Sequence, residues 1–457
     1  MSANSLADLD RAHLIHPVMS WSGHEKEGAV VLQSAKGAYV TDVTGRTLLD
    51  GFAGLWCVTV GYGQESIVRA ASKQMRRLPY ATAYFGYGSE PAIRLAARLA
   101  QLAPDGLTHI FFTLGGSDAV DTAVRFIRFH SHASGKPEKR HIISLDRGYH
   151  GSSSNGAGIT GLPAFHRDSD LPRPWQHHIA DPYPYRNPVG PDPSAIIADS
   201  VAALRTKVAE IGTDKVAAFF CEPVQGSGGV VVPPVGWLAA MRRTARELGI
   251  LMLVDEVITG FGRTGPMFAS EAEGVAPDFM TVAKGLTSGY SPMGAVFVSD
   301  EIYQTIRDGS ADGVPIGHGL TYSAHPVSAA VALATLDLYL HGGILANGQR
   351  VGKMLGERLK SFSDHPLVGD VRSRGMLAGI ELVVDKRAKT KPDRALRISE
   401  RLAERGYENR LIFRALPTTS SGWNRHCRAR QMKSISLSRG CRRPWTISSK
   451  CRRFARR

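Results

Sequence analysis

The chain contains 457 residues, of which 43% are hydrophobic and 21% are charged, and this composition excludes a disordered or fibrous protein. Its net charge of +15 would normally point to an acidic partner such as nucleic acid. The charge is concentrated, however, because residues 416–457 contain 12 Lys and Arg and no Asp or Glu. Residues 1–415, with 44 basic and 41 acidic residues, carry a net charge of only +3. We therefore expect no nucleic-acid partner.

Cysteine usage and the N-terminal segment bear on the cellular location. Only Cys57 and Cys221 precede residue 416, and none of the five cysteines has the spacing of a disulfide framework or a metal site. The N-terminal residues lack an apolar core of signal-peptide length, and no run in the chain approaches 18 apolar residues. These observations predict a cytoplasmic protein with no membrane span and no metal.

The hydrophobic pattern changes along the chain. Turn residues at Lys36–Gly37 and Thr44–Gly45 divide 29–60 into three short strands, which predicts an antiparallel meander. Beyond about residue 63, short apolar runs alternate with segments of helical spacing. This alternation is typical of an α/β fold with a parallel sheet covered on both faces. The apolar runs lie at 109–114, 141–145, 215–223, 249–257 and 279–283.

The segment 416–457 differs from the rest in composition, because it is rich in Arg and Ser and has no acidic residue and no clear period. One interpretation is a basic disordered extension, and another is an arm that binds nucleic acid or a membrane surface. We favour a third, a change of reading frame. Ordinary codons for 416–422, read from the third base, encode Ala-Asp-Asp-Val-Ile-Gly, and those for 444–453 encode Leu-Asp-Asp-Ile-Leu-Glu-Met-Pro-Glu. These peptides are acidic and match the composition of the body.

Two polar residues stand at the ends of buried apolar runs. Lys284 follows FMTVA (279–283), and Asp255 ends the run ILMLV (250–254). A buried lysine is costly unless it is paired or used covalently, and a desolvated lysine is suited to forming a Schiff base. A buried carboxylate needs a cationic partner, and a protonated pyridine nitrogen would serve. The alternatives are a snorkelling surface lysine and a helix-capping or metal-binding aspartate.

Two further motifs follow other apolar runs. Gly115–Gly116–Ser117 separates a predicted strand from a predicted helix, and such a turn offers backbone N–H groups and a hydroxyl to an anion. Tyr149 follows the run at 141–145 and could stack on a flat cofactor, although a tyrosine of the core is the alternative. There is no Walker lysine motif and no G-x-G-x-x-G, which disfavours a nucleotide site.

These four features, in this order, resemble the class III (omega) aminotransferases, and amine–pyruvate aminotransferases among them. The resemblance covers about 1–415 and is sharpest in LVDEVITGFGRTG (253–265), Lys284–Gly285 and HGLTYSAHP (318–326). It implies a pyridoxal 5'-phosphate (PLP) enzyme of fold type I, with a mostly parallel seven-stranded sheet in a large domain and a smaller α+β domain. The implied parts are an N-terminal segment of the small domain (1–60), the large PLP-binding domain (61–330), the C-terminal small domain (331–415) and the aberrant basic tail (416–457).

The resemblance also implies a role for each matching residue. Lys284 would hold the cofactor as a Schiff base and move the proton, and Asp255 would bind the pyridinium nitrogen. The remaining cofactor-binding residues would be Gly116, Ser117, Tyr149, Glu222, Val257 and, from the neighbouring subunit, Thr321. The substrate pocket would be formed by Trp56, Tyr149, Phe85 from across the dimer interface, and Arg414, which would bind a substrate carboxylate or else be a surface arginine.

The implied activity is transamination, in which an amine or amino-acid donor and an oxo-acid such as pyruvate react in turn by a ping-pong mechanism. A homodimer with shared active sites is implied as well. An aminomutase, decarboxylase or racemase of the same fold would share Lys284 and Asp255, and Arg414 favours transamination over them. An inactive product of a disrupted gene and a basic-tailed binding protein are the remaining alternatives.

Overall fold

The computed structural model describes residues 5–311 and 314–416, which form two compact units. Among the described residues, the first unit contains 5–54, 364–369 and 381–416, and the second contains 55–363 and 370–380. These units differ from the expected domains mainly over 331–363, which belongs to the second unit. The prediction made for the basic tail falls, apart from Leu416, outside the described residues.

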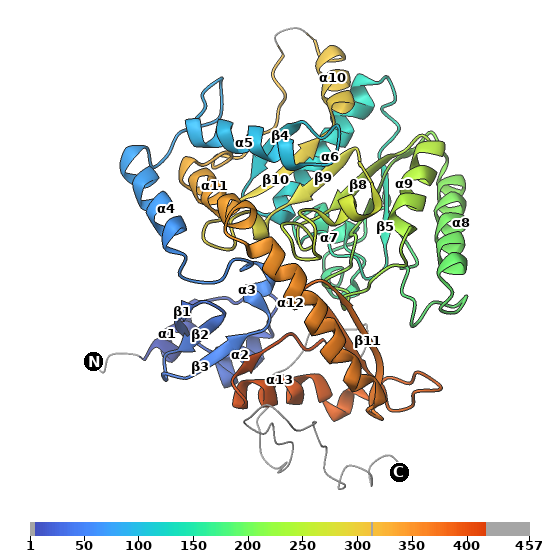
Figure 1. The fold of residues 1–457 in the computed structure, drawn as a ribbon. Coiled ribbons are helices and arrows are strands. Elements are labelled where there is room, and N and C mark those ends of the chain that lie inside the picture. Colours follow the sequence, from blue (N-terminus) through green and yellow to red (C-terminus); the bar gives the residue numbers. More distant parts are fainter. Residues whose placement is uncertain (1–4, 312–313, 417–457) are drawn as a thin grey trace. The chain divides into compact units, whose positions relative to one another are not determined.

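The second unit is built on a seven-stranded sheet with the strand order β4-β10-β9-β8-β7-β5-β6. Strands β4, β10, β9, β8 and β5 of this sheet are labelled in Figure 1. Strand β10 runs antiparallel to both of its neighbours, and the other pairs are parallel. The expected mostly parallel seven-stranded sheet is therefore confirmed. The strands are β4 (His109–Thr113), β5 (His141–Leu145), β6 (Gln176–Ile179), β7 (Val216–Cys221), β8 (Leu251–Asp255), β9 (Phe279–Val282) and β10 (Gly294–Val298).

Apolar side chains are buried on both faces of this sheet. All six residues of β7 are buried, and its successive residues Phe219 and Phe220 belong to different core clusters. Phe220 packs in the cluster that contains α6 and α10, whereas Phe219 packs in the cluster that contains α8 and α9. Because side chains alternate across a strand, a strand buried on both faces has a continuous apolar sequence. This explains why the runs lack an alternating pattern.

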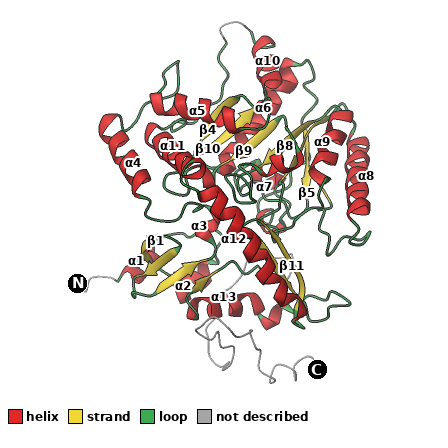
Figure 2. Cartoon of the chain, in the orientation of Figure 1, coloured by secondary structure: helices red, strands yellow, loops and turns green. Residues whose placement is uncertain are grey.

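Helices pack around the sheet and alternate with the strands along the chain (Figure 2). A third core cluster joins α4, α5 and α11 to β9 and β10. The helices of the second unit, apart from the short α3 (Ala53–Trp56) that begins in the first unit, are α4 (Glu65–Arg77), α5 (Glu90–Leu102), α6 (Gly116–Ala133), α7 (Gly156–Ile159), α8 (Pro193–Ile211), α9 (Trp237–Glu247), α10 (Asp300–Asp308), α11 (Pro326–Leu340) and α12 (Ile344–Leu359).

The first unit contains the expected meander, which consists of β1 (Leu32–Lys36), β2 (Tyr39–Asp42) and β3 (Thr47–Asp50). A fourth strand, β13 (Leu411–Ile412), pairs parallel with β3 and follows helix α13 (Ile398–Glu408). Helices α1 (Leu6–His13) and α2 (Trp21–Glu27) precede the meander. A separate two-stranded sheet, β11 (Val368–Arg374) with β12 (Leu377–Leu382), has residues in both units.

The described residues include no single helix that is both long enough and apolar enough to cross a membrane. One pair of helices, Pro326–Leu340 and Ile344–Asp364, satisfies the length and composition test only when taken together, and it is bent by 62°. Nine residues of α11 are buried in the second unit.

Candidate active site

Residues that the motifs single out follow the carboxyl ends of adjacent parallel strands in the second unit. Glu222 directly follows β7, Asp255 ends β8, and Lys284 lies two residues after β9. Tyr149 follows β5, and Ser117 lies in the first turn of α6. Because parallel strands end at the same edge of a sheet, this is the edge at which open α/β sheets bind ligands. Hydrogen bonds and close approaches of the backbone join most of these residues into one cluster.

Asp255 is buried, with 4% of its surface exposed. One carboxylate oxygen, Oδ2, lies 2.9 Å from Nδ1 of His150, and the other accepts a hydrogen bond of 3.0 Å from the backbone N–H of Val257. The other ring nitrogen of His150, Nε2, is buried and has no hydrogen-bond partner among the described residues. Sequence reasoning assigned no role to His150. In the sequence, only its position next to Tyr149, in Tyr149–His150–Gly151, indicates that His150 lies near the site.

Glu222 connects the loop after β5 to the loop after β7. Its carboxylate accepts hydrogen bonds from the backbone N–H groups of Tyr149 at 2.9 Å and Gly226 at 3.1 Å. Burial raises the pKa of Glu222 to about 7, against the opposing effect of His150, while Asp255 raises it further. The two N–H donors favour the charged form of the Glu222 carboxyl group and so oppose the effect of burial on its pKa.

The turn that begins α6 approaches the strand-end cluster closely. A Cβ atom on Gly116 would lie 2.9 Å from Cγ1 of Val257, and one on Gly151 would lie 2.7 Å from Oγ of Ser117. Glycine is therefore required at both positions, because a methyl group has no room. The Ser117 hydroxyl also accepts a hydrogen bond of 3.3 Å from the backbone N–H of Ser152. These two close approaches define a glycine cradle at the start of α6, in which a Cβ atom at either position would be too close to its neighbours.

Lys284 has a positive φ of 31°, which is an uncommon backbone conformation for a residue with a side chain. The backbone of the next residue, Gly285, is held in place, since its carbonyl accepts a hydrogen bond of 2.6 Å from the hydroxyl of Tyr339. Tyr339 is itself buried and hydrogen-bonded to Thr59. Burial raises the pKa of the Cys57 thiol, and the positive charges of Lys284 and Arg263 act in the opposite direction.

The residues predicted to bind the substrate differ in burial and in the unit to which they belong. Trp56 packs beside the apolar cluster of Val224, Val230, Ile258 and Leu377, which also belongs to the second unit. Tyr149 contacts Phe165, with ring centroids 5.3 Å apart. Phe85, which is 92% exposed, and Thr321, which is also exposed, both lie in the second unit. Arg414 belongs to the first unit, so its predicted role stays a prediction.

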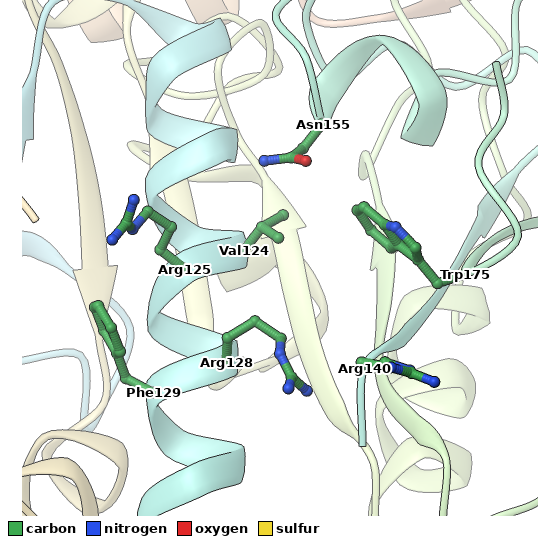
Figure 3. Close-up of a pocket in the computed structure, with 7 residues that line it drawn as sticks. All are labelled: Val124, Arg125, Arg128, Phe129, Arg140, Asn155 and Trp175. Atoms are coloured by element: carbon green, nitrogen blue, oxygen red, sulfur yellow. The ribbon is translucent and has the colours of Figure 1, made fainter. Parts of the chain in front are cut away.

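A pocket of about 510 Å³ is present elsewhere in the second unit and contains none of the predicted site residues. Figure 3 shows it between α6 and the segment around Trp175, with Arg128 and Asn155 directed toward the space between them. The lining residues are Val124, Arg125, Arg128, Phe129, Arg140, Asn155 and Trp175.

The residues at the strand ends fit PLP. The cofactor has an anionic phosphate, a ring nitrogen that is basic, and an aldehyde that reacts with an amine. The cluster offers a helix N-terminus with a glycine cradle for the phosphate, the buried carboxylate of Asp255 for the ring nitrogen, and Lys284 for the aldehyde. Nε2 of His150 is a buried polar atom next to these residues that has no hydrogen-bond partner among the described residues, and buried polar atoms in proteins are usually hydrogen-bonded.

Comparison with known proteins agrees with this fit. The aminotransferase class-III family matches residues 22–415. The putrescine–pyruvate aminotransferase of Pseudomonas aeruginosa is 41% identical over 413 residues, which cover 90% of this chain and 89% of that protein. The diaminobutyrate–2-oxoglutarate transaminase of Halomonas elongata is 39% identical over 391 residues, which cover 85% of this chain and 83% of that protein.

Solved structures are similar over the same region. A thermostable (S)-enantioselective omega-transaminase from Thermomicrobium roseum has a TM-score of 0.87 at 41% identity and covers 90% of this chain and 91% of its own. The omega-transaminase from Pseudomonas jessenii, solved in complex with PMP, has a TM-score of 0.88 at 35% identity and covers 91% and 92%. These matches confirm the resemblance and fold type I, and they do not favour the other PLP reactions. The chain belongs to the class III aminotransferases, which are PLP-dependent transaminases.

Proposed function

We propose that the strand-end cluster carries the transamination, with Lys284 as the residue that binds the cofactor covalently and then moves the proton. When bound, PLP supplies an aldehyde for the substrate amine and an electron-withdrawing ring. Asp255 would hold the proton of the ring nitrogen, and His150 would hold Asp255 through the 2.9 Å hydrogen bond. The convergence of Asp255, Lys284 and the glycine cradle at one sheet edge is the observation that carries this proposal.

The remaining residues of the cluster would bind and orient the reactants. Gly116 and Ser117 would bind the phosphate, and Val257 and Tyr149 would pack on opposite faces of the cofactor ring. Glu222 would keep the loop that carries Tyr149 in place, which its 2.9 Å hydrogen bond to the Tyr149 N–H supports.

We further propose that the donor is a primary amine and the acceptor an oxo-acid such as pyruvate. The printed activity of the Pseudomonas aeruginosa relative, a putrescine–pyruvate aminotransferase, supports this assignment. The apolar cluster beside Trp56 supports a donor without a carboxylate, because burying an unpaired carboxylate against such a surface is unfavourable. Arg414 would bind the carboxylate of the oxo-acid.

A donor screen tests the substrate assignment. The purified protein would be supplied with pyruvate and, separately, with alkyl monoamines, alkyl diamines and α-amino acids, and alanine formation would be measured. We expect the amines to be the better donors. Turnover with α-amino acids alone would contradict the proposed donor class but leave the family activity intact.

We also propose a homodimer in which Phe85 and Thr321 complete the site of the neighbouring subunit, because both are exposed in the single chain. Mixing a Lys284→Ala parent with a Thr321→Ala parent tests this arrangement. In a heterodimer with shared sites, one site carries both lesions and the other is intact. Activity should therefore recover above both parents, and no recovery despite proven subunit exchange would contradict sharing.

The scarcity of cysteine before residue 416 supports a cytoplasmic location.

A further inference from the structure

The first unit brings together three potential metal ligands near its N-terminus. Asp10 lies on α1, His24 lies on α2, and His16 lies in the segment between these helices. Nε2 of His16 is 2.7 Å from Oδ1 of Asp10, and Nε2 of His24 is 2.6 Å from Oδ2 of the same carboxylate. One ligand atom from each of the three residues can be chosen so that all three atoms lie within 4.8 Å of one another.

The three side chains are partly shielded from water. Their exposed fractions are 10% for Asp10, 8% for His24 and 27% for His16. Both oxygens of the Asp10 carboxylate are engaged, Oδ1 by His16 and Oδ2 by His24. The rings of the two histidines meet edge to face, with centroids 4.7 Å apart, and both present Nε2 to that carboxylate.

This ligand set has the chemistry of a zinc-type site. Two imidazole nitrogens and one carboxylate oxygen bind Zn²⁺ at about 2.0–2.2 Å, with a fourth position open to water. Such bond lengths place tetrahedral ligand atoms roughly 3.3 Å apart, so the present hydrogen-bond distances would have to open by less than about 1 Å. His16 can supply that movement, because it lies outside both helices and is the most exposed of the three. On binding, each neutral imidazole would carry its proton on Nδ1 in place of Nε2.

We propose that Asp10, His16 and His24 form a binding site for one divalent transition-metal ion of the Zn²⁺ or Co²⁺ class. The linear sequence did not predict it, because the three residues are spaced unlike any familiar metal motif and only the turn between α1 and α2 brings them together. Mg²⁺ would bind poorly, since it prefers six oxygen ligands. The ion would cross-link α1 to α2, and none of its three ligands is among the residues proposed for transamination.

Titration of the chelator-treated holoenzyme with Co²⁺ tests the proposal. The test variant is the double substitution His16→Gln/His24→Gln, because an amide can still donate a hydrogen bond to Asp10 but is a poor metal ligand. His13→Gln is the matched control, since His13 is exposed on α1. We expect the wild type and the control to bind one more equivalent of Co²⁺ than the double variant, with weak visible absorption that Zn²⁺ abolishes and Mg²⁺ does not. In the double variant the Kd of this site should rise at least tenfold.

Equal stoichiometry and equal affinity in the wild type and the double variant would overturn the proposal and leave a hydrogen-bonded cluster only. Cys427, Cys441 and Cys451 provide other possible ligands, but thiolate binding gives intense near-ultraviolet absorption and would not change in the double variant. X-ray absorption of the wild type loaded with one equivalent of Zn²⁺ gives a second measurement that needs no variant. A shell of nitrogen and oxygen with imidazole scattering is expected, and a sulfur shell would overturn the proposal.

Discussion

Nδ1 of His150 lies 2.9 Å from Oδ2 of Asp255, although the two residues are separated by 105 positions in the chain. The contact joins the loop after β5 to the end of β8, so it fixes the orientation of the buried carboxylate. A carboxylate that must stabilise a cationic ring nitrogen is useful only if it remains charged and correctly directed. In the proposed mechanism, His150 would therefore act through Asp255, as a positioning residue.

We predict that Asp255→Asn lowers kcat by roughly a thousandfold, because a pair of charges at about 4 Å and an effective dielectric constant of about 20 contributes about 4 kcal/mol. His150→Ala should have a smaller effect, roughly tenfold to a hundredfold, corresponding to a hydrogen bond to a charged group. The measurements are kcat, cofactor content after dialysis and the far-ultraviolet circular dichroism of each variant. His341→Ala, at an exposed histidine after α11, is the control. A kcat within twofold of the wild type in Asp255→Asn would remove this residue from its role.

Lys284→Ala should abolish transamination, because in the proposed mechanism both the covalent attachment of the cofactor and the proton transfer depend on the same amine. The variant should also lose cofactor on dialysis faster than the wild type. Lys207→Ala serves as the control, since Lys207 lies on α8, where it forms an ion pair with Glu210. Turnover at the wild-type rate in Lys284→Ala would refute the mechanism.

Gly116→Ala should weaken cofactor binding, since the new methyl group would lie 2.9 Å from Cγ1 of Val257 and would displace the start of α6. Gly348→Ala is the matched control, because it lies within α12 and has nothing within 4 Å of its Cβ position. That control should bind cofactor normally and gain up to about 1 kcal/mol of stability from helix propensity. Equilibrium dialysis against PLP and chemical unfolding measure the two effects. Equal cofactor affinity in both variants would show that the cradle has no role in binding.

Glu222 should make the stability of the cofactor-free protein depend on pH. Its pKa of about 7 in the folded state lies above the ordinary value of 4.5, so the folded state binds the proton more strongly than the unfolded state. The resulting stabilisation is fully present below about pH 4.5 and is lost as pH rises through about 7. Relative to Glu222→Gln, the free energy of unfolding of the wild type should fall by on the order of 3 kcal/mol as the pH rises from below about 4.5 to above about 7. Urea unfolding at several pH values measures the difference, and parallel curves for the two proteins would contradict the assignment.

The sequence predicted that polar residues stand at the ends of buried strands, because each apolar run and the residue after it are local features of the chain. Asp255 and Lys284 were recognisable because a charged residue at the end of an apolar run is unfavourable without a partner. The role of His150 was not recognisable, because it depends on how the loop after β5 folds back against β8. The extent of the second unit was also hidden, since α11 has an apolar sequence with little periodicity and its packing against α4 and α5 is a long-range property. Turn residues, by contrast, correctly indicated the meander of the first unit.

A change of reading frame after residue 415 would alter what covers the first unit. In the first unit, the described chain ends shortly after β13, where Leu411, Ile412 and Phe413 are only partly buried. The residues that follow contain no acid and no helical or strand period, whereas the shifted frame encodes acidic segments with regularly spaced apolar residues. Such segments are suited to covering half-buried apolar side chains, each of which contributes about 1.5–3 kcal/mol when fully buried. Restoring the shifted frame after Ala415 should therefore raise both the soluble yield and the midpoint of thermal unfolding, compared with the chain as written. Sequencing of the gene provides the control, because codons that do not encode Ala-Asp-Asp-Val-Ile-Gly in the shifted frame would exclude this explanation.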